Sequence, residues 1–125
     1  MNVNSTERLP GLVRLGLCAG PAETGRPARI TDGAPVTSLW NEYGDNSGRL
    51  FSGIWSSTAG SWQVDYTEEE VCVILEGRIR LTAADGIAED FGPGDSFVIP
   101  SGFRGTWTTL EPVRKLYVIY EPPAA

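Results

Sequence analysis

The residues that could perform chemistry in this 125-residue chain are acids, amines and phenols, because the sequence contains no histidine. Without an imidazole, neither a Ser-His-Asp nor a Cys-His catalytic arrangement can form. Iron, zinc and nickel favour imidazole or thiolate ligands, which are scarce here. Carboxylates remain, and three occur together as Glu68–Glu70. We interpret Glu68 and Glu69 as a solvated turn, whereas Glu70 begins an apolar segment.

The two cysteines, Cys18 and Cys72, are too few for a disulfide framework. Cys72 lies in the apolar segment and is typical of a small buried hydrophobic residue. Cys18 ends a short apolar run that resembles a lipoprotein signal, but Arg14 interrupts the run and Leu17 occupies the position that a small residue would need. We therefore expect no signal sequence, no membrane span and a cytoplasmic location.

The charge of the chain argues against a nucleic-acid partner. Its net charge is −6, its isoelectric point is near 4.5, and its ten basic residues are scattered. Binding to phosphates needs clustered lysines and arginines. The length predicts one domain with its own core, and 15 glycines and nine prolines favour short strands joined by turns.

The pattern of apolar residues predicts strands and no helix from Arg49 onward, after a short apolar piece at residues 38–43. Trp62, Val64 and Tyr66 alternate with polar residues, which is typical of a half-buried strand. Residues 1–37 form a proline- and glycine-rich arm, partly extended, whose leucines could add an edge strand or cover a second subunit. The predicted strands of the 38–125 domain span residues 49–55, 61–66, 70–76, 78–82, 87–91, 96–100, 106–109 and 114–120. So many short strands indicate an all-β sandwich or barrel.

Two motifs in this β region resemble those of the cupin superfamily. Glu70, six residues and Gly77 match the second half of the first cupin motif, and Gly94 with Pro100-Ser-Gly102 matches the first half of the second motif. Together the motif regions cover about half of the chain. The resemblance implies an all-β, single-domain cupin, which is a double-stranded β-helix or jelly-roll barrel.

Longer stretches are similar to one cupin subgroup. They include Trp62-Gln-Val-Asp-Tyr66, Glu70-Val-Cys-Val-Ile-Leu-Glu-Gly77 and Pro112-Val-Arg-Lys-Leu-Tyr-Val-Ile-Tyr120. The subgroup resembles the cupin domains of ureidoglycine aminohydrolase and of the ethanolamine-utilisation cupin. This resemblance implies small nitrogen-containing compounds as possible ligands.

The positions that hold metal ligands in the wider superfamily carry other residues here. The two histidines of the first motif fall on Val64 and Tyr66 or, counted from Gly60, on Tyr66 and Glu68. The histidine of the second motif falls on Gly105, and its asparagine falls on Thr109. One or two carboxylates rarely hold Ca²⁺ or Mg²⁺ alone. We therefore expect no metal and no cofactor.

In the resembled fold, these positions point into the mouth of the barrel, and strand alternation then brings further residues to the same cavity. Trp55, Trp62, Cys72, Gly105, Trp107 and Tyr117 are the candidate ligand-binding residues, and Glu70, Lys115 and Tyr66 are the candidate catalytic residues. We expect Gly105 to leave room where a ligand to metal would have stood. The alternative is that the aromatic residues only fill a core and that Glu70 and Lys115 form an ordinary cross-strand ion pair.

The candidate binding and catalytic residues are compatible with three functions. The first is metal-independent binding of a small polar molecule, which could contain nitrogen, in an aromatic-lined barrel. The second is a metal-independent hydrolase or lyase in the catabolism of small nitrogen compounds, in which Glu70, inside the barrel beside Lys115, acts as acid or base and Tyr66 donates a hydrogen bond. The third is a non-catalytic regulatory or interaction protein. The resemblance also implies a homodimer.

Overall fold

The structure, a computed structural model, describes residues 11–124, so the first ten residues of the predicted arm lie outside it. Its described residues contain strands and no helix, and therefore no helix that could cross a membrane. They confirm the predicted all-β, single-domain architecture. The strands are β1 (Glu23–Gly25), β2 (Ile30–Gly33), β3 (Thr37–Gly44), β4 (Leu50–Ser57), β5 (Gly60–Asp65), β6 (Glu69–Ala83), β7 (Ala88–Phe91), β8 (Ser96–Ile99) and β9 (Arg104–Tyr120).

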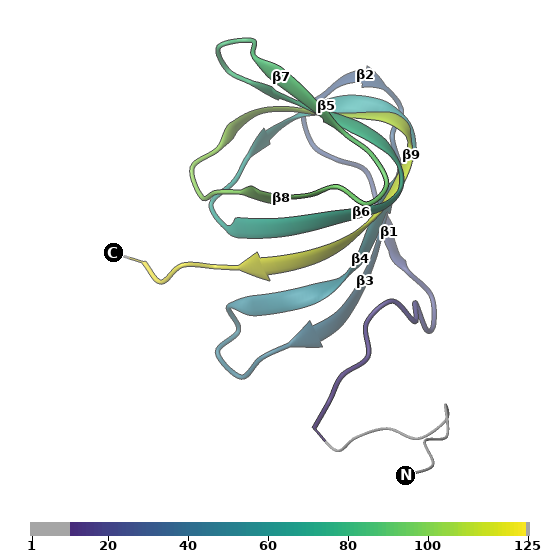
Figure 1. The fold of residues 1–125 in the computed structure, drawn as a ribbon, viewed down its shortest axis with the longest axis vertical. Helices are drawn as coiled ribbons and strands as arrows, with labels where there is room; N and C mark the ends of the chain where they lie inside the picture. Colours follow the sequence, from purple (N-terminus) through teal and green to yellow (C-terminus); the bar gives the residue numbers. More distant parts are fainter. Residues whose placement is uncertain (1–10, 125) are drawn as a thin grey trace.

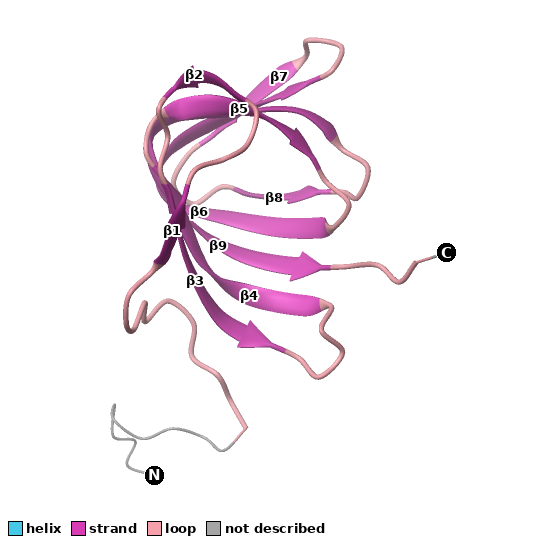
Figure 2. Ribbon diagram, turned by 180° about the vertical axis from the view of Figure 1, so that it is seen from behind, coloured by secondary structure: helices cyan, strands magenta, loops and turns pink. Residues whose placement is uncertain are grey.

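These strands form one antiparallel sheet that curls around its own inner face (Figures 1 and 2). The two longest strands, β6 and β9, pair along most of their length and connect the two ends of the curled sheet. The first half of β9 also pairs with β5, and its second half pairs with β4. The inward residues of β4, β5, β6 and β9 therefore share one interior.

Gly77 lies within β6 and does not end a strand, contrary to the sequence-based prediction of separate strands at 70–76 and 78–82. Likewise, the predicted strands at 106–109 and 114–120 are both parts of β9. The β6–β9 register shifts around Gly77, whose φ is +83°. A Cβ on Gly77 would lie 2.1 Å from the Pro112 carbonyl oxygen. Glycine therefore permits a bend and a close backbone approach that keep the long strands paired around the curl.

The core lies on the inner face of the curled sheet. It consists of the buried side chains of Trp62, Cys72, Ile74, Ile79, Ile99, Trp107 and Val113. They come from β5, β6, β8 and β9, with Val113 beside the bend. Removing these apolar side chains from water stabilises the closed part of the sheet and fixes the directions of the inward residues.

The N-terminal arm contributes two edge strands, but neither contains the leucines that were expected to form one. The short β1 pairs with β3, and β2 pairs with β5. Residues 12–17 form no strand, and Leu12 and Leu17 are 68% and 57% exposed. This segment is instead held by Glu42, whose carboxylate accepts hydrogen bonds from the backbone N–H groups of Gly16 and Cys18 at 2.7 and 2.9 Å.

Candidate functional site

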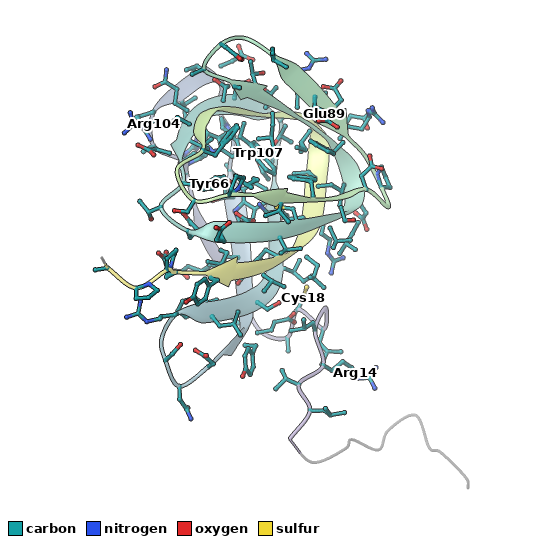
Figure 3. All side chains as sticks on the ribbon, turned by 60° about the vertical axis from the view of Figure 1, so that its left-hand side comes forward. Arg14, Cys18, Tyr66, Glu89, Arg104 and Trp107 are labelled. Atoms are coloured by element: carbon teal, nitrogen blue, oxygen red, sulfur yellow. The ribbon has the colours of Figure 1, made fainter. Side chains whose placement is uncertain are left out.

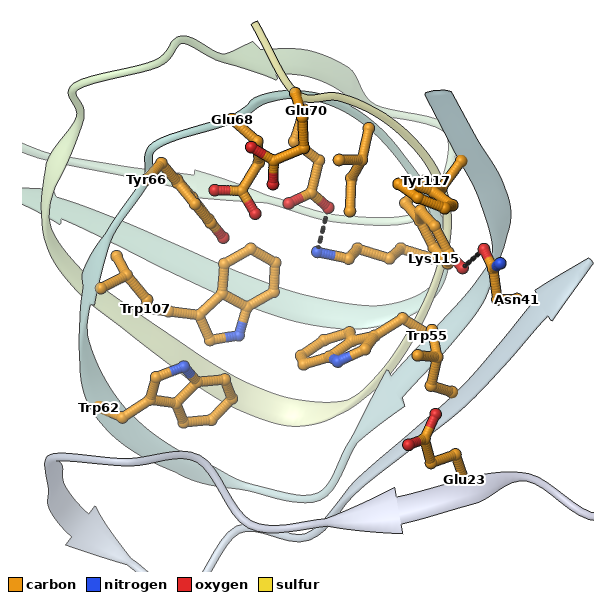
Figure 4. Close-up of a pocket in the computed structure, with 15 residues that line it drawn as sticks. Glu23, Asn41, Trp55, Trp62, Tyr66, Glu68, Glu70, Trp107, Lys115 and Tyr117 are labelled. Atoms are coloured by element: carbon orange, nitrogen blue, oxygen red, sulfur yellow. Dashed lines mark hydrogen bonds and ion pairs between the residues drawn. The ribbon is translucent and has the colours of Figure 1, made fainter. Parts of the chain in front are cut away.

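The inner face of the sheet encloses a cavity of about 560 Å³ (Figure 4). Its aromatic lining consists of Phe51, Trp55, Trp62, Tyr66, Trp107 and Tyr117. Its charged lining consists of Glu23, Glu68, Glu70, Lys115 and Glu121. Glu23 and Asn41, which also line the cavity, are exposed, so this edge of the cavity is open to solvent. The volume lies within the range of sites for small molecules.

Strand alternation brings most of the predicted site residues to this cavity. In β5, Trp62 and Val64 point inward, and Tyr66 follows directly after the strand. In Figure 3, Tyr66 and Trp107 lie inside the curled sheet, whereas Arg104 projects from the outside, where it pairs with Asp65 at 3.3 Å. The predicted residues that line the cavity are Trp55, Trp62, Tyr66, Glu70, Trp107, Lys115 and Tyr117.

A buried ion pair lies at the wall of the cavity. The Nζ atom of Lys115 is 2.7 Å from Oε2 of Glu70, and each residue is 4% exposed. The same ammonium lies 4.4 Å from the ring centroids of both Trp55 and Trp107, within the distance of a cation–π interaction. Burial alone would lower the pKa of Lys115, but the charge and hydrogen bond of Glu70, together with Cys72 and Tyr66, outweigh burial, and the pKa of Lys115 lies above its ordinary value. Lys115 is therefore an ammonium at neutral pH.

The two phenols of the cavity remain protonated at neutral pH. Burial raises the pKa of Tyr66 well above its ordinary value, with Lys115 opposing this shift in part. Burial likewise raises the pKa of Tyr117 to about 12. The Tyr117 hydroxyl donates a hydrogen bond to Oδ1 of Asn41 at 2.6 Å, which ties β9 to β3. Tyr66 can thus donate a hydrogen bond to a bound molecule but cannot act as a base.

Two predicted site residues do not line the cavity. Cys72 points inward as alternation requires, but it is fully buried in the core, and its thiol donates a hydrogen bond to Oε2 of Glu70 at 3.3 Å. Burial raises the pKa of Cys72 to about 12, so it is a neutral thiol. The room expected at Gly105 is also absent. A Cβ on Gly105 would lie 2.1 Å from the Thr82 carbonyl oxygen, because neighbouring backbone fills that space.

Sequence reasoning left three of the four cavity carboxylates out of the candidate binding and catalytic residues, although one register of the first motif placed Glu68 at the barrel mouth. Glu68, interpreted as part of a solvated turn, is half-buried and lines the cavity, because the chain bends inward before β6. Glu23 comes from the arm, and Glu121 directly follows β9. Only Glu68 carried a usable signal: it is two residues before Glu70 and two after Tyr66, so it continues their alternation.

The residues at the motif positions do not fit a transition metal. The first-motif positions are occupied by Val64, Tyr66, Glu68 and Glu70, all of which line the cavity. Valine offers no ligand atom, and Tyr66 is a neutral phenol. Within residues 11–124, no three side chains of His, Cys, Asp or Glu lie close enough together to hold a metal ion. Glu70 is instead neutralised by Lys115.

Comparisons with known proteins agree with this fold. The family model described as "EutQ-like cupin domain" matches residues 44–117. The EutQ protein of Clostridium difficile is similar in structure, with a TM-score of 0.63 and 19% identity, over 70% of this chain and 64% of that protein. A DUF861 family protein of Thermotoga maritima is 39% identical, with a TM-score of 0.50, over 51% of this chain and 73% of that one.

A further similar structure is a DUF861 family protein of unknown function from Pseudomonas syringae pv. tomato. It has a TM-score of 0.70 and 25% identity, over 80% of this chain and 43% of that protein. The chain thus spans less than two thirds of the length of both the Clostridium and the Pseudomonas proteins. No curated protein matches the sequence.

Proposed function

Because the chain belongs to the EutQ-like cupin domain family, we propose that it binds a small polar molecule in its aromatic-lined cavity, in the cytoplasm and without a metal ion. The cavity of about 560 Å³ carries this proposal. Its lining joins aromatic surface with a few polar groups that converge on one space, as ligand sites do. If the barrel were only a packed core, its large side chains would be expected to fill this space.

The polar groups of the cavity suit the recognition of a ligand that has both donors and acceptors. Tyr66 and the ammonium of Lys115 offer donors. Glu70 offers an acceptor, because its hydrogen bonds to Lys115 and Cys72 both involve Oε2, and no hydrogen bond among the described residues involves Oε1. The burial of Glu70 and Lys115 strengthens these contacts, because hydrogen bonds and ion pairs are stronger in surroundings less polar than water.

Native mass spectrometry and metal analysis of the purified protein test this proposal most directly. We expect either a co-purifying organic molecule or a hit among small polar metabolites in a thermal-shift screen. Substituting Trp62→Leu should weaken binding of that molecule at least tenfold by removing ring surface from the wall. Phe91→Leu is the matched control, because Phe91 stacks on Phe97 outside this cavity. Equal affinity in all three proteins, or binding only with stoichiometric iron or zinc, would contradict the proposal.

A second candidate is a metal-independent hydrolase or lyase that acts on small nitrogen compounds. Glu70 would be its acid or base, Tyr66 would donate a hydrogen bond, and Lys115 would stabilise negative charge as a permanent ammonium. The Oε1 atom of Glu70 accepts no hydrogen bond from the described residues, so it is available to exchange a proton with a substrate, and this favours the second candidate. Once a ligand is known, Glu70→Gln separates the two functions: loss of turnover with retained binding supports catalysis, and unchanged turnover rules out the acid–base role.

A further inference from the structure

The negative charges that line the cavity outnumber the positive ones. Four carboxylates and one ammonium line it, and Lys115 neutralises Glu70 alone. The remaining acids are Glu23, Glu68 and Glu121, which give the lining a formal charge of −3. None of the ion pairs within residues 11–124 involves these three residues. Arg49 does reach Glu121, but its guanidinium bonds to the backbone carbonyl and not to the carboxylate.

The acids lie on more than one side of the aromatic surface. In Figure 4, Glu68 points into the cavity beside Glu70, and Glu23 lies across the cavity near Trp55. The rings already attract one positive charge, because the Lys115 ammonium lies 4.4 Å from two indole centroids. Trp62 is stacked against Trp107 and belongs to neither of these cation–π contacts, so it offers further ring surface to a ligand.

From these observations we propose that the ligand is an organic cation, an amine or a quaternary ammonium compound with a short hydrocarbon part. This inference rests on the proposed binding function and specifies its ligand class. The cationic group lies toward Glu68 and Glu121, where it meets unpaired carboxylates. The hydrocarbon part packs on Trp62 and its neighbouring rings. Ring faces and carboxylates both attract such a group, and a lining of −3 repels anions.

The spacing of the acids favours an organic cation over a metal ion. A metal ion needs several ligand atoms about 2.0–2.6 Å away from it, and no three acidic or thiol side chains of the described chain are so grouped. An organic ammonium is larger and can contact separate carboxylates through different hydrogens or methyl groups.

A set of probes that differ mainly in charge tests the inference. Choline and 3,3-dimethylbutan-1-ol have nearly the same shape, with a positive nitrogen replaced by a neutral carbon, and 3,3-dimethylbutanoate is the anionic counterpart. Butylamine represents primary amines, and calcium chloride represents a metal alone. Binding is measured by calorimetry and by quenching of tryptophan fluorescence. We expect at least one of the two ammonium probes to bind at least tenfold more tightly than the alcohol and the carboxylate, and its affinity to fall with added salt.

Variants locate the effect. Glu68→Gln should weaken binding of the ammonium probe about tenfold, which corresponds to about 1.4 kcal/mol, and should leave the affinity for the neutral alcohol unchanged. Glu111→Gln removes the same charge from an exposed position outside the cavity and should change little. A loss equal to that of Glu68→Gln would show that only the overall charge matters and would overturn the inference.

The outcomes distinguish this inference from the proposed function. Tighter binding of the alcohol, the carboxylate or calcium than of the ammonium probes would overturn the organic-cation inference. If the tighter ligand is the alcohol or the carboxylate, the proposed binding of a small polar molecule would still stand. If no probe binds and the metabolite screen also yields no ligand, both are overturned.

Discussion

The buried ion pair predicts a large and strongly non-additive effect on stability. Replacing Lys115 by methionine keeps much of its hydrocarbon volume against the indoles but leaves Glu70 without its cation at 4% exposure. Removing one partner of a buried pair costs about 3–5 kcal/mol. Because Glu70 faces an open cavity, water can partly solvate it, so we expect Lys115→Met to lower the free energy of unfolding by about 3 kcal/mol.

The double variant Lys115→Met/Glu70→Gln should recover most of this loss. Glutamine has the shape of glutamate without its charge, so no uncompensated ion remains buried, and a buried pair replaced by neutral residues is often tolerated. We expect the double variant to lie within about 1 kcal/mol of the unmodified protein, which gives a coupling energy of about 2 kcal/mol or more.

Urea denaturation at pH 7, followed by tryptophan fluorescence, measures all four free energies, and the rings beside Lys115 make this signal sensitive to the site. Arg80→Met is the matched control, because Arg80 forms an ion pair with Asp90 at 2.7 Å on the exposed surface, where such pairs contribute about 0–1 kcal/mol. If Lys115→Met lowers the free energy of unfolding by less than about 1 kcal/mol, or if the effects of the two substitutions are additive, Glu70 and Lys115 do not form a buried ion pair in which each charge depends on the other.

Three further predictions concern packing, pH and assembly. Gly105→Ala should lower stability by about 1–3 kcal/mol in urea denaturation, because the new Cβ would meet the Thr82 carbonyl at 2.1 Å; unchanged stability would mean that this backbone moves freely. Stability should fall above about pH 9, because the folded pKa of Cys72 rises to about 12 and those of the cavity lysine and tyrosines also rise. The unfolded chain then releases protons that the folded chain retains, each lowering stability by up to about 1.4 kcal/mol per pH unit; Cys72→Ala should flatten this slope, and a constant stability from pH 8 to 11 would refute it. A homodimer remains a prediction. Val71 and Val98, which pair across β6 and β8 and are 40% and 59% exposed, support it by forming an uncovered apolar surface. Light scattering should give twice the mass of 13.5 kDa, and Val98→Lys should reduce the measured mass.

Much of the cavity could be predicted from the sequence because alternation along a strand fixes which residues share a face. Trp62 and Tyr66 follow from the pattern of their segment, and Lys115 and Tyr117 follow from that of the last strand. The cupin resemblance adds the information that these faces point inward. This reasoning needs only local geometry and the family of the fold, and the structure agrees with it.

The rest depended on contacts between distant parts of the chain. Glu23 reaches the cavity because β1 pairs with β3, and no local pattern indicates that pairing. Two glycines misled the sequence-based predictions. Gly77 suggested the end of a strand and Gly105 suggested open space. At both positions a neighbouring backbone carbonyl lies so close that an added Cβ would be 2.1 Å from it. A sequence shows that a side chain is missing without showing what occupies its place.

The ion pair also explains how a cupin barrel can keep the glutamate of its first motif without the histidines. An isolated carboxylate at 4% exposure would be costly to bury, so Glu70 requires a positive partner. In this chain the partner is the ammonium of Lys115, which belongs to the protein and is further stabilised by two indole rings. An internal cation of this kind makes a metal at Glu70 unnecessary for charge balance. It leaves the other carboxylates of the cavity unpaired, and these are the groups to which a cationic ligand can respond.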